Sequence, residues 1–208
     1  MARIGLPAAL QAMLYDISNI LVQVYINAFG TTAMAAWAVF GKLDSLFWMT
    51  VQSLGLAVTT FAGQNFGARR FERMRSGIGF GFALGIVAFM LGLGGPLFGC
   101  FTADAEVVEL GLLMARFVMP WYLSFIGIEV LSATMRGAGD TLVPTLITVF
   151  GVCAVRLAWL FWAAPLYGGI RAGLACFPVS WCVTLLLYLC YYLPGGWLRR
   201  RIDAQREE

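Results

Sequence analysis

The chain has 208 residues, of which 61% are hydrophobic and only 12% are charged, and its formal net charge is +3. A soluble domain is typically about half apolar and about a quarter charged, so this chain has too little polar surface to cover a water-soluble globule. The composition therefore predicts an integral membrane protein. Histidine is absent, which excludes histidine metal sites, Ser-His and Cys-His nucleophile pairs, and histidine proton relays.

Six apolar segments are long enough to cross a bilayer as helices, which takes about 20 residues each. They run approximately over residues 6–29, 32–62, 77–99, 107–136, 141–164 and 171–193. Membrane β-barrels use short alternating strands instead, so we expect an all-α fold with six transmembrane helices. We expect these helices to form a single unit over residues 1–198, followed by a basic and polar tail at 199–208.

The first segment follows Met1 directly and is longer than the apolar core of a signal peptide, so we expect a spanning helix. Polar side chains interrupt it well inside the membrane. They are Gln11, Asp16, Ser18, Asn19, Gln23 and Asn27. A polar stripe on a membrane helix faces protein or water rather than lipid. This stripe therefore either lines a transport path or joins helices, and the sequence leaves both open.

Two carboxylates are predicted at similar depth on the first and second helices. Asp16 lies 14 residues before Gly30, and Asp44 lies 13 residues after Thr31. At about 1.5 Å per residue, both lie about 20 Å below the outer turn. Such a pair can share a proton or hold a cation. The alternative is that Lys42 neutralises one acid structurally, although Lys42 and Asp44 are two residues apart and point to different faces.

Three further ionisable residues fall inside expected spans. Glu129 lies about 12 Å from the inner end of the fourth helix, where it either faces a polar cavity or pairs with an arginine. Arg116 and Arg156 fall in the outer half of the membrane, where they either pair with acids or extend along their helices toward water. Soft or aromatic residues near the acids are candidate walls for an aromatic cation, although ordinary packing explains them equally well. These are Met13, Phe47, Trp48 and Met49.

The second helix ends in GQNFGARR, residues 63–70. Here Gly63 and Gly67 allow the chain to turn, and the side chains of Gln64 and Asn65 can cap carbonyl groups that lose helical partners.

Glycines and prolines within the later spans indicate where helices pack closely and where they kink or break. Gly77, Gly81 and Gly85 recur at steps of four, which predicts a seam where two helices approach closely. Pro120 and Pro178 lie deeper in their helices and should kink or break them. Broken helices in transporters often border substrate cavities, but many kinks are only architectural.

The distribution of basic residues predicts the orientation. With the N-terminus inside, the inner regions contain Arg3, Arg69, Arg70, Arg73, Arg75, Arg136, Arg199, Arg200, Arg201 and Arg206. The outer loops contain only Arg171. The positive-inside rule therefore predicts a cytoplasmic-membrane protein with both termini in the cytoplasm. Topology fully explains the arginines at 69–75, so nucleic-acid binding is not predicted.

Four blocks of sequence together resemble a known family. They are GLPAALQAMLYDISNILVQ at 5–23, AAWAVFGKLDSLFWM at 35–49, TTFAGQNFGARR at 59–70 and MRGAGDTLVP at 135–144. Their order and spacing resemble the carboxy-terminal half of a MATE multidrug exporter across essentially the whole chain. GQN-x-GA before a basic linker and RGAGDT before a proline are fairly specific in combination, and weak separately.

The resemblance implies twelve helices in two six-helix lobes that exchange protons or sodium ions for cationic, often aromatic, drugs by alternating access. It implies lipid, a second lobe and small cationic substrates as partners, and no resident cofactor or metal. Asp16 falls close to an acid that some members use for cation coupling, and Glu129 is the nearest residue to an acid essential in others. The candidate coupling-ion and substrate residues are Asp16, Asp44, Glu129, Gln11, Asn19 and Gln23. The structural motif residues are Gly63, Gln64, Asn65 and Gly67 at one helix end, and Arg136, Gly137, Gly139 and Asp140 in a turn.

Several alternatives stay open at this point. The chain is one lobe, so it is either a fragment, a truncated gene product, a half-transporter that dimerises, or an inactive lobe that needs a partner. A lipid-linked oligosaccharide flippase of the same superfamily would use Arg116 and Arg156 to bind pyrophosphate, whereas the paired acids favour a cationic cargo. An intramembrane enzyme has no support, because the sequence has no histidine, metal-ligand cluster or nucleophile motif.

Overall fold

The computed structural model describes residues 2–74, 76, 77, 79, 81, 101–193 and 197, and every regular element within them is helical. Up to residue 137 the elements are α1 (Ala2–Asn27), α2 (Thr31–Gly67), α4 (Ala105–Val118), the 3-10 turn η2 (Met119–Trp121) and α5 (Tyr122–Gly137). The elements after residue 137 are α6 (Leu142–Thr148), η3 (Val149–Ala154), α7 (Val155–Ala158), η4 (Trp159–Ala163), α8 (Ala164–Tyr167), α9 (Gly169–Leu174) and α10 (Cys176–Tyr192). These bounds differ by a few residues from the expected spans.

Four helical stretches among the described residues are long and apolar enough to cross a membrane. They are Thr31–Gly67, Ala105–Gly137, Leu142–Tyr167 and Gly169–Tyr192. The helix α1 is not among them, and its polar stripe interrupts its apolar sequence. Most of the span expected at 77–99 lies outside the described residues. The all-helical membrane fold is therefore confirmed, while the count of six spans stays a prediction.

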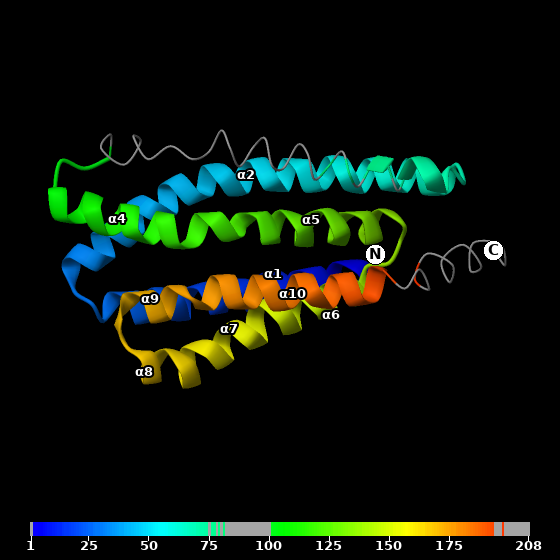
Figure 1. Ribbon diagram of the computed structural model, residues 1–208. Coiled ribbons are helices and arrows are strands. Elements are labelled where there is room, and N and C mark those ends of the chain that lie inside the picture. Colours follow the sequence, from blue (N-terminus) through cyan, green and yellow to red (C-terminus); the bar gives the residue numbers. More distant parts are fainter. Residues whose placement is uncertain are drawn as a thin grey trace.

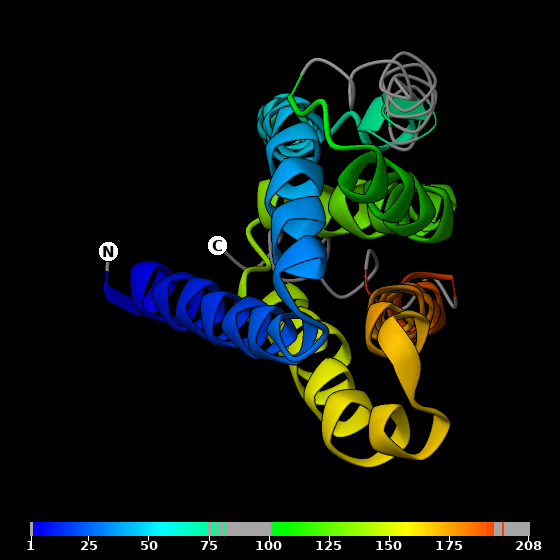
Figure 2. The same ribbon diagram turned by 90° about the vertical axis from the view of Figure 1, so that its left-hand side faces the viewer.

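The long helices run side by side along one direction (Figure 1). The helix α2 packs against α4 and α5, while α10 packs against α5 on one side and against α6, η3 and α7 on the other. The helix α1 contacts α6, η3, α9 and α2 and extends to one side of the bundle (Figure 2). Apolar side chains fill the spaces between these helices; Ile126, Trp181 and Tyr188 are among the fully buried ones.

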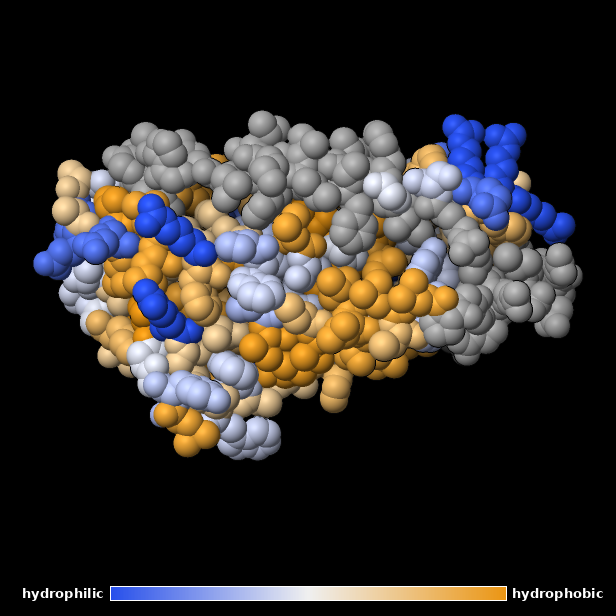
Figure 3. All heavy atoms as spheres, in the orientation of Figure 1, coloured by the Kyte–Doolittle hydropathy of each residue, from blue (hydrophilic) through white to orange (hydrophobic). Residues whose placement is uncertain are grey.

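One end of the bundle collects the start of α1 and the ends of α2, α5 and α10 (Figure 1). On the face seen in Figure 3, the most hydrophilic residues lie toward the two ends of the molecule and hydrophobic residues lie between them. A protein that crosses a membrane has this distribution, because its two ends meet water and its middle meets the apolar core of the bilayer.

The end of α2 corrects one expectation. The helix continues through Gly63, which does not form a turn, and ends at Gly67; the residue with positive φ after it is Arg69, at 56°. Gly63 instead allows a close crossing, because a Cβ there would lie 3.1 Å from the carbonyl oxygen of Gly137 on α5. Packing rather than turn geometry therefore explains glycine at this position.

Both deep prolines interrupt their helices as expected. Pro120 lies in η2, the 3-10 turn that separates α4 from α5. Pro178 lies in the first turn of α10, immediately after the break between α9 and α10 at Ala175. A proline ring removes a helical hydrogen bond and clashes with the preceding turn.

The glycine seam is also found as far as the structure describes it. A Cβ on Gly77 would overlap the ring of Phe61 on α2, and a Cβ on Gly81 would lie 3.0 Å from Val58. Gly85 lies outside the described residues.

Candidate transport cavity

A cavity of about 700 Å³ opens between α1, α2, α5 and α10, and α4, α6 and α7 each contribute one residue to its wall. Its lining mixes amides, acids and arginines with aromatic rings. The volume suits a drug-sized organic molecule.

One face of α1 forms a polar wall of this cavity. Its lining residues are Gln11, Tyr15, Asp16, Asn19 and Gln23. These positions are three or four residues apart or adjacent, so they share one side of a helix. Met13 lies off this face and is 60% exposed outside the cavity. Ser18 is fully buried and does not line the cavity either.

Asp16 is exposed at the cavity wall. Within the described part of the chain it makes no hydrogen bond and no ion pair. Its carboxylate is therefore free to meet a ligand or an ion.

Asp44 lines the same cavity but is held by its neighbours. The Tyr122 hydroxyl donates to Oδ1, and the Trp48 indole Nε1 donates to Oδ2 at 2.8 Å. The two acids predicted as a pair therefore share a cavity but not a hydrogen bond. The alternative role of Lys42 is not found among the described residues, where its ammonium lies 5.7 Å from the Phe101 ring centroid.

Two of the four predicted wall residues, Trp48 and Met49, line the cavity. Phe47 does not; it stacks on Tyr122 with ring centroids 4.2 Å apart. This stack fixes the ring whose hydroxyl holds Asp44.

Glu129 fulfils both of its predicted alternatives. It lines the cavity, and its Oε1 accepts from Arg136 Nη2 at 2.7 Å. Arg136 also donates from Nη1 to the Ser132 hydroxyl at 2.6 Å, so the guanidinium spans two turns of α5. Gly55 on α2 makes room for this pair, since a Cβ there would overlap the Glu129 carboxylate.

Arg156 follows neither of its predicted alternatives. It is fully buried on α7 at the cavity wall, without an acidic partner among the described residues. Its Nη1 donates to Asn19 Oδ1 at 2.8 Å, and its guanidinium lies 4.5 Å from the Phe177 ring centroid and 5.3 Å from that of Tyr15. The sequence does mark Arg156 as a candidate functional residue, because an arginine in the middle of an apolar segment is energetically costly. It does not show that the side chain is fully buried.

Two donor groups of the buried Arg156 guanidinium have no hydrogen-bond acceptor. A cation–π contact contributes about 1 kcal/mol, and a hydrogen bond from a charged group about 1.5–3 kcal/mol. Burying an ion costs several kcal/mol, and each buried donor without an acceptor costs about 1–3 kcal/mol more. The Nε and Nη2 groups of Arg156 both lack acceptors. An acceptor beside them would therefore lower the free energy of the site.

The motif at residues 63–67 and the motif at residues 136–140 both lie at the end of the bundle where α1 starts and where α2, α5 and α10 end. The Asn65 amide donates to the Phe61 carbonyl at 2.8 Å, one turn back inside α2, and no side-chain bond is described for Gln64. Backbone N–H groups of Ala68, Arg69 and Arg70 donate to the carbonyls at the helix end, so the expected side-chain cap is not found among the described residues. Gly139 adopts a φ of 81° after α5, and Asp140 N–H closes the turn on the Met135 carbonyl at 2.9 Å. The Asp140 carboxylate accepts from the Trp197 indole at 2.9 Å.

Comparison with known proteins adds a family and a fold. A family model described as MatE matches residues 7–162. The chain is 30% identical over 200 residues to a probable multidrug resistance protein, YoeA, of Bacillus subtilis, covering 91% of this chain and 42% of the relative. It is 24% identical to a probable multidrug resistance protein NorM of Thermotoga maritima, covering 96% and 45%. It is also 26% identical to a protein of Shewanella oneidensis named FAD transporter, covering 93% and 43%.

Solved structures share the fold. A multidrug resistance MATE family transporter of the MOP superfamily, in an outward-facing conformation, aligns with a TM-score of 0.81 at 20% identity, covering 92% of this chain and 44% of that chain. A MOP superfamily transporter from Pyrococcus furiosus, whose title describes a binding pocket of reverse polarity, aligns with a TM-score of 0.80 at 21% identity. This chain spans less than half the length of the relatives and structures it matches.

Proposed function

Because this chain belongs to the MatE family, we propose that it forms one lobe of an exporter that moves cationic aromatic compounds across the cytoplasmic membrane in exchange for protons or sodium ions. The observation that carries the proposal is the free carboxylate of Asp16 on the wall of a polar and aromatic cavity. The second lobe belongs to the same polypeptide or to a separate chain.

In the proposed cycle, Asp16 alternates between cargo and coupling ion. The ionised carboxylate attracts a cationic cargo, whose rings lie against Trp48 and Met49. Binding of a proton or sodium ion neutralises the carboxylate and removes that attraction, so the cargo leaves. Asp44 contributes negative potential from a fixed position, since Tyr122 and Trp48 both donate to it.

The proposed orientation has both termini in the cytoplasm, with the arginines after α2 on the inner side. This arrangement follows the positive-inside rule. Efflux is favoured over flipping of lipid-linked oligosaccharides because the relatives are named as multidrug resistance proteins. One relative is named a FAD transporter, so the relatives' names do not restrict the cargo to drugs.

Ligand binding to the chain itself provides the first test. We would reconstitute the chain in nanodiscs of neutral lipid and measure the binding of ethidium, a fluorescent aromatic cation. Acidification or added sodium should compete with ethidium, and an Asp16→Asn variant should lose both the tight binding and the competition. Glu109→Gln, which removes an exposed acid outside the cavity, is the matched control.

Transport is then tested in a chimera in which this chain replaces the 200 residues of YoeA that it matches. The chimera should drive ethidium efflux from cells, and Asp16→Asn should abolish it at equal membrane abundance. Efflux by the Asp16→Asn chimera at the parental rate would refute the role of Asp16. Binding without efflux in the parental chimera would favour the inactive-lobe alternative.

A further inference from the structure

A cluster of hydrogen-bond donors without acceptors lies in the cavity wall around Arg156. The buried polar atoms that have no hydrogen-bond partner include the Tyr15 hydroxyl, Arg156 Nε and Nη2, and Trp181 Nε1. These three residues come from α1, α7 and α10, and all three line the cavity. The Tyr15 hydroxyl is close to both other side chains without reaching hydrogen-bond geometry. The Arg156 and Trp181 side chains, from α7 and α10, therefore lie beside the Tyr15 hydroxyl of α1.

The charge of the cluster is also unbalanced. The ion pair among the described residues joins Glu129 to Arg136. Asp44 already accepts from Tyr122 and Trp48. Around Arg156 itself lie the amide of Asn19 and the rings of Tyr15 and Phe177. None of these groups carries a negative charge. Asp44 interacts with Arg156 electrostatically but forms no ion pair with it, so Arg156 has no direct acidic partner among the described residues.

The two free nitrogens of Arg156 form a specific pattern. Nε and Nη2 lie on the same edge of the guanidinium and donate in parallel, which matches the two oxygens of a carboxylate or phosphate. Asn19 holds the remaining nitrogen, Nη1, at 2.8 Å. The ring of Phe177 stacks on the guanidinium at 4.5 Å. The guanidinium is thus held in place with its bidentate edge unused.

We propose that Arg156, with Tyr15 and Trp181, forms an oxyanion-binding subsite of the cavity that takes the carboxylate or phosphate group of an aromatic ligand. The free edge of Arg156 binds two oxygens, and the Trp181 indole and Tyr15 hydroxyl donate to the same group. The rings of Phe177 and Trp181 provide the apolar surface beside it. The proposal goes beyond the proposed function, whose cargo is a cation, and rests on it only in taking this cavity as the place where ligands bind.

Three naphthalene probes isolate the charge of the ligand. They are 2-naphthoate, an anion; 2-naphthamide, its neutral analogue; and 2-naphthylmethylammonium, a cation. Binding is measured by calorimetry on the full chain in nanodiscs of neutral lipid, after subtraction of empty nanodiscs. We expect the parent chain to bind naphthoate at least about tenfold more tightly than naphthamide, as a charge-assisted bidentate pair should.

Two variants assign this preference to the subsite. Arg156→Gln should lose about tenfold in naphthoate affinity while it still binds the naphthylmethylammonium cation, which shows that the cavity is intact. Trp181→Phe keeps an aromatic ring but removes one donor, so it should lose roughly threefold for naphthoate alone. Arg171→Gln, an exposed arginine outside the cavity, should change neither affinity.

Several results would overturn the subsite. Naphthoate binding no tighter than naphthamide, or a preference that survives Arg156→Gln, contradicts it. A preference that appears only with Asp16→Asn shows that Asp16 is the internal partner of Arg156, and also contradicts it. If Arg156→Gln fails to fold, Trp181→Phe decides: an unchanged naphthoate affinity contradicts the subsite and a selective loss supports it. If the parent chain binds naphthoate but not naphthylmethylammonium, the result contradicts the proposed function and leaves the subsite standing.

Discussion

Gly55 on α2 packs where α5 carries the ion pair between Glu129 and Arg136. A Cβ at Gly55 would overlap Oε1 of Glu129, and that oxygen accepts from Arg136 at 2.7 Å. Gly55→Ala should therefore displace the carboxylate and lower the free energy of unfolding by about 1–3 kcal/mol. The measurement is reversible unfolding in mixed micelles with increasing SDS, followed by tryptophan fluorescence.

Gly41 provides the matched control in the same helix. Nothing lies within 4 Å of a Cβ built there, so Gly41→Ala should raise the free energy of unfolding by roughly 0.5–1 kcal/mol through helix propensity alone. Changes of opposite sign in the free energy of unfolding for Gly55→Ala and Gly41→Ala would support the close contact between Gly55 and Glu129. If both variants unfold at the same SDS fraction as the parent chain, Glu129 is not fixed by this contact.

The depth of polar residues could be predicted from the sequence, but their rotation about the helix axis could not. Counting residues along two antiparallel helices places Asp16 and Asp44 at one depth, and both line the same cavity. The hydrogen-bond partner of Asp44 on another helix is Tyr122, 78 residues away. Which residues meet across helices depends on how the helices turn against each other, and one sequence contains no direct record of that rotation.

The crossing of α2 and α5 depends on two glycines. A Cβ at Gly137 would lie 2.5 Å from the Thr59 carbonyl oxygen and 3.0 Å from the Gly63 backbone nitrogen. Backbone atoms in a helix cannot move aside as a flexible side chain can. Gly137→Ala should thus force the two helices apart and cost at least about 3 kcal/mol, at or above the upper range for overpacking.

This prediction is tested by thermal denaturation of the detergent-solubilised chain, read as the loss of the monodisperse peak in size-exclusion chromatography. Gly67→Ala is the control, because nothing lies within 4 Å of a Cβ at the end of α2. A Gly137→Ala chain as heat-stable as the Gly67→Ala chain would contradict the close crossing.

Helix breaks were predictable only where a residue type dictates them. Pro120 and Pro178 mark breaks that the structure contains. The π-helical segments Val149–Ala154 and Trp159–Ala163 carry no such signal, because an apolar run without an internal proline reads as regular helix. The first of these segments packs Gly151 so closely on Thr184 that a Cβ would overlap it. π-Helical turns often occur at functional sites, and Arg156 follows this one by two residues.

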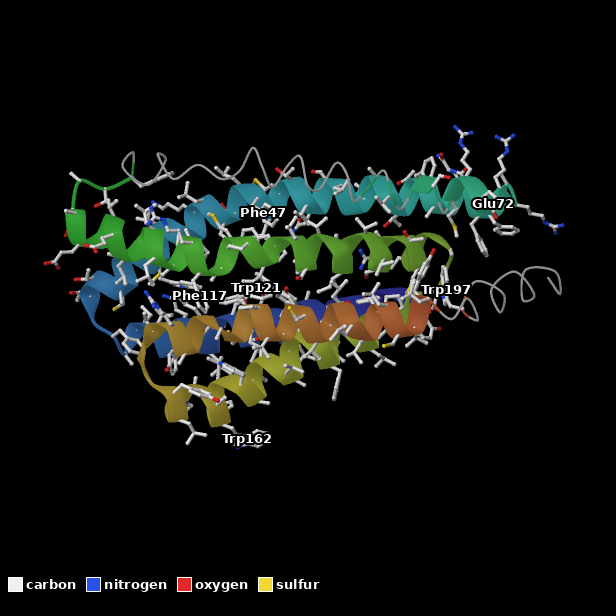
Figure 4. The ribbon with its side chains drawn as sticks, viewed as in Figure 1. Phe47, Glu72, Phe117, Trp121, Trp162 and Trp197 are labelled. Carbon is white, nitrogen blue, oxygen red and sulfur yellow. The ribbon has the colours of Figure 1, made fainter. Side chains whose placement is uncertain are left out.

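At the scale of the molecule, composition predicts the membrane class and motif order predicts the family. The side-by-side helices expose apolar side chains such as Trp162, which points away from the bundle and is 76% exposed (Figure 4). Leu146 and Phe150 are also more than 60% exposed. In a membrane these faces meet lipid or the second lobe. The sequence does not distinguish the two surroundings, because both are equally apolar.

The proposed orientation can be measured at two exposed acids on opposite ends of the bundle. Glu72 lies five residues beyond the last residue of α2, at that end of the bundle (Figure 4), and Glu106 lies at the start of α4, in the expected outer loop. With cytoplasmic termini, a cysteine at Glu72→Cys should react with an impermeant maleimide only in inside-out vesicles, and one at Glu106→Cys only in intact cells. Replacing acids leaves the basic residues that direct insertion unchanged.

The native cysteines set the background for this experiment. Cys153 and Cys176 are buried, whereas Cys190 is exposed, so labelling is counted only above that of the unsubstituted chain. A reversed pattern would place the arginines after α2 outside and overturn the orientation. Labelling of both positions from both sides would show that the chain does not insert with a single topology when it is expressed alone. In that case the second lobe would be needed to fix the topology, because positive charges near the spans would not suffice.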